Sequence, residues 1–115
     1  MVIVRFRNQA DWFKANWVFA CFAEYVLPAI GDPVLRRAFE AGSDFGTLRL
    51  DRMEVAAART LLKTIERVAV TTLDGGLDDL NARFAADASG YAMYLRAIEE
   101  LLALTREDLA ADEGA

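Results

Sequence analysis

The first 25 residues constrain the fold most, because they hold seven of the chain's twelve aromatic side chains: Phe6, Trp12, Phe13, Trp17, Phe19, Phe22 and Tyr25. Placed on a helix over residues 9–27, the apolar side chains point in nearly every direction. The polar residues Lys14, Asn16 and Glu24 do not gather on one face. A helix that is apolar on all sides is buried centrally or shared with another chain. The segment therefore predicts the centre of a domain or an interface between chains.

The chain as a whole is rich in helix-forming residues. Of its 115 residues, 21 are alanine and only two are proline. Alanine is the best helix former, because it loses no side-chain entropy in a helix. A chain of this length is expected to form one domain. We therefore predict a single helical domain over residues 1–110 and a frayed acidic tail over residues 111–115.

Two short segments alternate in the manner of strands. In residues 2–7 the side chains of Val2, Val4 and Phe6 share one face. Residues 46–50 repeat the alternation, with leucine on one face. Alternation with a period of two predicts half-buried strands. We expect residues 2–7 to pair antiparallel with residues 46–50 as a small two-stranded ribbon.

Proline, glycine and short polar residues mark the limits of the first two helices. Asn8 is a predicted N-cap for the first helix, and Pro28 is expected to end it. Asp32 and Pro33 predict the start of a second short helix. Gly42 is expected to end that helix in the left-handed conformation.

The second half of the chain is predicted to be entirely helical. Asp51 and Glu54 resemble a capping box that opens a helix over residues 52–73. A last helix is expected over residues 90–110, and whether residues 77–110 form one helix or two stays open. The predicted fold class is α+β, mainly α: an antiparallel bundle of four to five helices with a small two-stranded antiparallel ribbon.

The residues that are absent exclude much enzyme chemistry. The chain has no histidine and one cysteine, Cys21. Nucleophiles activated by histidine, histidine-dependent zinc sites and iron–sulfur clusters are therefore excluded. No phosphate-binding glycine loop is present. We expect no enzyme activity, no metal and no cofactor. One alternative stays open, in which Glu99 or Glu100 acts with Tyr91 or Tyr94 as acid and base.

The charge of the chain is acidic and unevenly distributed. The net charge is −5, and residues 58–115 account for all of it. Such a surface repels phosphate backbones, so nucleic-acid binding is not expected. The leading hypothesis is a protein-binding domain, most concretely an inhibitor or immunity-type protein that covers a basic partner. Its candidate contacts are Asp78, Asp79, Glu99 and Glu100. Solubility alone is the simpler interpretation of the charge.

The aromatic segment offers two further binding hypotheses. In the first, Trp12, Trp17, Phe22 and Tyr25 form a surface for self-association, and the chain is a homodimer. Residues 2–7 could then pair with their equivalent in a second chain. In the second, a small-ligand or regulatory module has a pocket lined by Trp12, Trp17, Tyr91 or Tyr94 and closed by an arginine.

The chain is expected to reside in the cytoplasm without a membrane partner. Its most apolar run, residues 17–30, is too short to span a bilayer and contains Glu24. Cys21 lies within this run, where a free cysteine behaves as a small hydrophobic residue. A single cysteine cannot form an internal disulfide, which favours a reducing compartment.

Overall fold

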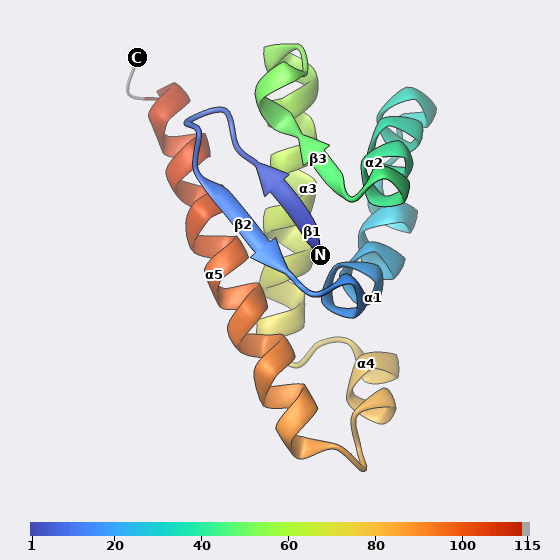
Figure 1. The fold of residues 1–115 in the computed structure, drawn as a ribbon. Helices are drawn as coiled ribbons and strands as arrows, with labels where there is room; N and C mark the ends of the chain where they lie inside the picture. Colours follow the sequence, from blue (N-terminus) through green and yellow to red (C-terminus); the bar gives the residue numbers. More distant parts are fainter. Residues whose placement is uncertain (114–115) are drawn as a thin grey trace.

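The computed structural model describes residues 1–113, with side chains through residue 111. It is a mainly helical α+β fold in which a small sheet lies against two long helices (Figure 1). The strands are β1 (Val2–Arg5), β2 (Asp11–Lys14) and β3 (Thr47–Arg49). The helices are α1 (Asn16–Val26), α2 (Pro33–Phe45), α3 (Val55–Leu73), α4 (Asp78–Arg83) and α5 (Ala88–Glu113).

The sheet is three-stranded and mixed, so the expectation of a two-stranded antiparallel ribbon is wrong. The strand order is β2-β1-β3, with β1 antiparallel to β2 and parallel to β3. Between β2 and β3 the chain passes through α1 and α2, and this crossover returns β3 parallel to β1. Because β1 has a neighbour on both sides, residues 2–7 cannot also pair with their equivalent in a second chain.

The second strand lies where the sequence predicted the first turns of a helix. Asn8 does not cap a helix: its side chain accepts a hydrogen bond from the Ala10 N–H at 3.0 Å inside a tight turn. Gln9 adopts a left-handed backbone with φ 71°, and the chain then reverses. Trp12 faces the core and Phe13 faces outward. Aromatic residues favour strands, and pairing with β1 satisfies this preference better than a helix does.

The predicted start of α2 is confirmed, whereas its predicted end is wrong. The Asp32 side chain accepts a hydrogen bond from the Val34 N–H at 2.8 Å, which confirms the predicted cap. Gly42 does not end the helix, because the left-handed C-cap is Gly46 with φ 77°. Gly42 is buried within the helix, and a Cβ there would meet Leu48 Cδ1 at 2.9 Å. Its role is therefore close packing of α2 on β3.

The helices of the second half begin differently from the prediction. Helix α3 starts at Val55 after Glu54, whose side chain makes no capping hydrogen bond, and so the predicted capping box is wrong. Asp51 instead forms an ion pair with Arg49. Residues 84–87 separate α4 from α5, so residues 77–110 form two helices. The Asp87 side chain accepts a hydrogen bond from the Gly90 N–H at 2.9 Å at the start of α5.

The core lies between the sheet, α1 and the α3–α5 pair. Its largest fully buried side chains come from these elements and from α2, α4 and the connecting segments: Trp12, Tyr94, Phe6, Phe22, Phe39, Leu50, Leu61, Leu62, Ile65, Leu80, Ile98 and Leu101. Each contributes about 1.5–3 kcal/mol by leaving water. The predicted central position of the aromatic segment is confirmed for most of its members. Gly114 and Ala115 lie outside the described residues, and the frayed tail over residues 111–115 stays a prediction.

A buried ion pair fastens the β1–β2 turn to the end of α5. Asp108 is only 2% exposed, and its carboxylate accepts hydrogen bonds from Arg7 Nε and from the Asn8 N–H, both at 2.9 Å. Arg7 Nη2 also donates to the Asp108 carbonyl at 3.1 Å. The contact joins residues about a hundred positions apart. It holds the sheet on the helices and fixes the turn that orients β2.

Candidate functional site: the outer face of the sheet

Side chains alternate across the sheet and give it an outer face that the helices do not cover (Figure 1). Val2, Val4, Trp12 and Leu48 point inward and are buried. The outward positions are Ile3, Arg5, Asp11, Phe13, Thr47 and Arg49, which we call the sheet face. The register places Phe13, Ile3 and Thr47 in one row. Asp11, Arg5 and Arg49 form the next row.

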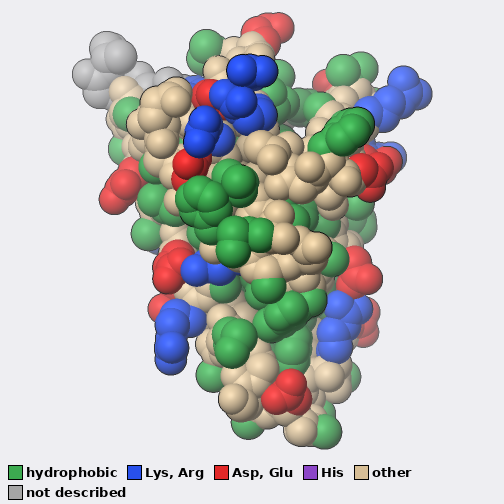
Figure 2. All heavy atoms as spheres, in the orientation of Figure 1, with side chains coloured by type: hydrophobic (Ala, Val, Ile, Leu, Met, Phe, Trp, Pro, Cys, Tyr) green, Lys and Arg blue, Asp and Glu red, His purple; other side chains and the backbone are tan. Residues whose placement is uncertain are grey.

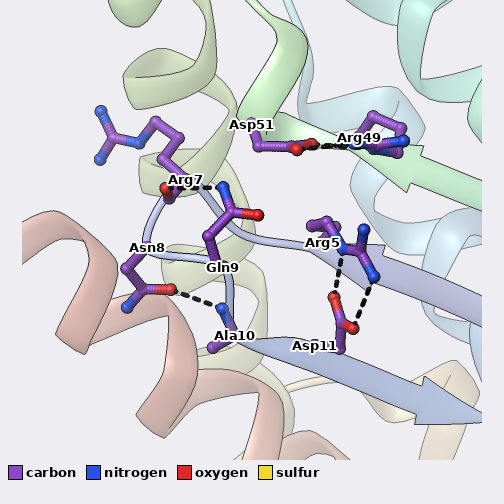
Figure 3. Close-up of polar contacts among 8 residues, drawn as sticks. All are labelled: Arg5, Arg7, Asn8, Gln9, Ala10, Asp11, Arg49 and Asp51. Atoms are coloured by element: carbon purple, nitrogen blue, oxygen red, sulfur yellow. Dashed lines mark hydrogen bonds and ion pairs between the residues drawn. The ribbon is translucent and has the colours of Figure 1, made fainter.

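Two arginine–aspartate pairs order the polar part of the sheet face (Figure 3). Arg5 donates from Nε and Nη2 to the two oxygens of Asp11 at 2.8 and 2.9 Å. Arg49 donates in the same way to Asp51 at 3.0 and 2.8 Å. These hydrogen bonds lower the pKa of Asp11 and of Asp51 and raise the pKa of both arginines. Bidentate pairs of this kind hold long side chains in one geometry.

Apolar side chains lie beside these pairs. Phe13 is 47% exposed, and it pairs with Ile3 across the two strands. Figure 2 shows hydrophobic side chains over the middle of this side of the molecule, with basic and acidic side chains above them. A hollow of about 280 Å³ lies beside the start of β1, and the exposed residues Met1 and Phe45 line it. An apolar centre with a polar border is typical of protein interfaces.

The structure separates the four aromatic residues predicted for self-association or for a pocket. Trp12 and Phe22 are buried, and Trp12 Nε1 donates to the Ala97 carbonyl at 3.0 Å. Trp17 is 43% exposed and borders a smaller hollow of about 170 Å³ with Lys14 and Met93. Tyr25 is half-buried on α1. These residues therefore do not form one surface, and Trp12 is part of the core.

The structure also divides the predicted acidic contacts into two places. Asp78 and Asp79 are exposed in the first turn of α4, beside a hollow that Tyr25 also lines. Glu99 and Glu100 are exposed on α5. Glu100 forms an ion pair with Lys14 at 2.6 Å. No interaction among the described residues brings the two pairs together.

The acidic and tyrosine side chains of the described residues bear on metal binding and acid–base chemistry. No group of three or more acidic or cysteine side chains within residues 1–113 could hold a metal ion. The resolved carboxyl pKa shifts, at Asp11 and Asp51, are downward, whereas a general acid needs a raised pKa. The Tyr91 hydroxyl donates to Asn81 Oδ1 at 2.7 Å. Tyr94 is buried, whereas Glu99 and Glu100 are exposed.

The chain was compared with protein-family models, curated proteins and solved structures. No protein-family model, no curated protein and no solved structure matches the chain. Across the described part of the chain, no helix is both long and apolar enough to cross a membrane.

Sequence reasoning missed the sheet face, although a signal for it was present. Residues 11–14 read Asp-Trp-Phe-Lys, and the two adjacent aromatic residues are a type that favours strands. The segment has no alternation of apolar and polar residues, so the helical interpretation of residues 9–27 included it. Arg5 with Asp11 and Arg49 with Asp51 become neighbours only once the register of the three strands is known.

Proposed function

We propose that the chain is a non-enzymatic protein-binding domain whose sheet face contacts its partner. The observation that carries this proposal is the exposed Phe13 beside Ile3, on a sheet that the Arg7–Asp108 pair fastens to the helices. Aromatic residues dominate binding energy where they meet a partner on a rigid, ordered surface.

The partner that fits this face is a second copy of the chain. Two copies with a net charge of −5 repel each other over most of their surface. The sheet face differs, because its two arginines are already paired, one with Asp11 on the same face and the other with the adjacent Asp51. A two-fold interface requires a patch that is its own complement. A face that carries apolar, cationic and anionic groups together meets this requirement.

Light scattering on purified protein tests the dimer. We expect the wild type at tens of micromolar to have twice the chain mass of 12.7 kDa. The Phe13→Ser variant should have the monomer mass and a somewhat lower melting temperature, because association stabilises the folded chain, while its helical circular dichroism spectrum is retained. Val34→Ser is the matched control, since Val34 is an exposed apolar residue on α2. A monomeric wild type, or a Phe13→Ser variant that stays dimeric, contradicts the proposal.

A second candidate is the acidic inhibitor of a basic partner. The observation that favours it is the pair Asp78 and Asp79, which are exposed and make no ion pair among the described residues. They lie in the half of the chain that carries the whole net charge. Electrostatic attraction of this kind speeds association and weakens as salt rises. Under this proposal the chain acts in the cytoplasm.

Affinity capture with salt titration distinguishes the two candidates. An immobilised domain should retain a basic protein that salt releases, and the Asp78→Asn/Asp79→Asn variant should lose it. The Phe13→Ser variant should still retain that protein, because its charge is unchanged. Recovery of no basic protein, or equal recovery by the aspartate variant, argues against the inhibitor.

A further inference from the structure

Three elements bring a small group of reactive and polar side chains together at the start of α5. Cys21 and Glu24 come from α1, Arg83 from α4 and Tyr94 from α5. Arg83 Nη1 donates to Cys21 Sγ at 3.2 Å, and its Nη2 pairs with Glu24 Oε2 at 2.6 Å. These two contacts raise the pKa of Arg83. The only sulfhydryl of the chain therefore lies against a fixed cation.

The hydroxyl of Tyr94 is the second unusual feature of this cluster. Tyr94 is 0% exposed, and its hydroxyl is buried without a hydrogen-bond partner among the described residues. Burial raises the pKa of this hydroxyl, and the neighbouring Cys21 raises it further. The hydroxyl thus keeps its proton and lies near the Cys21 sulfur without the geometry of a hydrogen bond. Buried polar groups without partners are rare in folded proteins, and each one calls for an explanation.

We propose that Cys21 is an oxidation site for hydroperoxides and that Arg83 and Tyr94 hold the oxygen it acquires. Reactive cysteines in proteins lie beside cationic groups, which stabilise the attacking sulfur anion. Arg83 supplies this cation in contact with the sulfur. Tyr94 supplies a donor that gains its missing partner only when the sulfur carries an oxygen. The two observations are independent, and both favour an oxygen atom on Sγ.

The reaction balances with a hydroperoxide as the only co-reactant. The thiol first releases its proton to solvent, and the sulfur then attacks the terminal oxygen of the hydroperoxide. An S–O bond forms and the O–O bond breaks. The leaving alkoxide or hydroxide takes a proton from solvent and departs as an alcohol or water. The sulfur is oxidised by two electrons to a sulfenic acid, and the hydroperoxide is reduced.

The sulfur is reached from the side of the molecule on which Arg83 and Glu24 lie. Cys21 is 7% exposed, whereas Arg83, which contacts its sulfur, and Glu24 are exposed residues. A small hydroperoxide reaches the sulfur during local opening of this surface, with Arg83 kept in contact. No second cysteine exists in the chain to convert the sulfenic acid to an internal disulfide. The product therefore persists, or it is captured by an external thiol.

Labelling of the folded protein with dimedone during a hydrogen peroxide titration tests the proposal. We expect one adduct on the wild type and none on Cys21→Ala. Arg83→Ala should slow labelling by about tenfold, the effect of losing one hydrogen bond to a charged group. Arg83→Lys should recover part of the rate, because it retains the charge. Arg96→Ala, which removes an exposed arginine elsewhere on α5, is the matched control and should label at the wild-type rate.

The Tyr94→Phe variant separates the role of the hydroxyl from that of the ring. Its reduced form should melt no lower than the wild type, since the lost hydroxyl has no partner. Its sulfenic acid should disappear about threefold faster, as expected for the loss of one neutral hydrogen bond. Labelling only after unfolding in urea would show Cys21 to be an inert core residue and would overturn the proposal. Equal rates in the wild type and Arg83→Ala would do the same.

Discussion

The molecule contains the same ionic contact, arginine with aspartate, in two different settings. Arg7 and Asp108 meet in the interior between the β1–β2 turn and α5, and Asp108 also accepts a backbone N–H. Arg5 with Asp11, and Arg49 with Asp51, meet on the sheet face. The first pair joins distant parts of the chain, whereas the others join close neighbours in sequence.

The difference in burial assigns different roles to these pairs. Removing one partner of a buried pair leaves an uncompensated charge in the interior, which is strongly destabilising. Removing an exposed partner leaves a group that water solvates, so the effect on stability is small. The buried pair therefore holds the fold. The exposed pairs keep their side chains ordered on a surface that can meet another molecule.

The largest expected effect follows from removing the buried carboxylate. Asp108→Ala should lower the free energy of unfolding by about 3–5 kcal/mol. The reason is that Arg7 then loses its ion pair with Asp108, and the Asn8 N–H loses its acceptor. Urea denaturation measures the change. Glu107→Ala, an exposed acidic neighbour on the same helix, is the control and should leave the midpoint unchanged. Similar midpoints for the two variants would remove the distinction between buried and exposed pairs.

A subtler change separates charge from shape at the same position. Asp108→Asn keeps the volume and one acceptor oxygen but places an N–H₂ group near the donors of Arg7 and Asn8. We expect a loss of about 1.5–3 kcal/mol, the contribution of a hydrogen bond to a charged group. A loss as large as that of Asp108→Ala would mean that the negative charge alone holds the turn.

The exposed pairs Arg5–Asp11 and Arg49–Asp51 should make the free energy of unfolding fall at low pH. The folded-state pKa of Asp11 and of Asp51 is lowered, so each contributes stability above the unfolded-chain pKa of about 3.9. That contribution is lost as the pH falls through the lowered folded-state pKa. Urea midpoints of the wild type should therefore exceed those of Asp11→Asn/Asp51→Asn at pH 7 and converge with them at pH 2. A difference that persists unchanged at pH 2 would contradict the assignment.

The smallest expected effect concerns Gln9, in the turn between β1 and β2. Gln9 has φ 71°, a conformation that costs a residue with a Cβ about 1–2 kcal/mol and glycine much less. Gln9→Gly should raise the free energy of unfolding by up to about 1 kcal/mol after the entropy of glycine is subtracted. Gln9→Ala serves as the comparison and should give no gain. Thermal melts that rank alanine above glycine would refute this account of the turn.

Long periodic patterns in the sequence predicted that the long helices exist, but not where each of them starts. The amphipathic stripe of α3 and the Asp32–Pro33 start of α2 depend on neighbours along the chain, so local propensity was sufficient. Short ambiguous patterns misled: residues 11–14 are a strand because β1 pairs with them, and Gly42 is a packing residue because Leu48 lies against it. Both outcomes depend on contacts with segments distant in the sequence.

The candidate sites were less predictable than the fold. The acidic residues Asp78, Asp79, Glu99 and Glu100 were identified from charge alone, and charge carries no information about where helices meet. The Cys21–Arg83 contact joins residues 62 positions apart, and no spacing rule connects them.

The sequence by itself determined the helical second half and the absence of histidine chemistry, because these depend on residue type and local periodicity. Only the tertiary structure decided that Trp12 is buried while Phe13 and Trp17 remain partly exposed. It also decided which arginine lies in the interior and which lie on the sheet face. The physical reason is that burial depends on which distant segment packs against a residue, and that choice is made by the whole chain together.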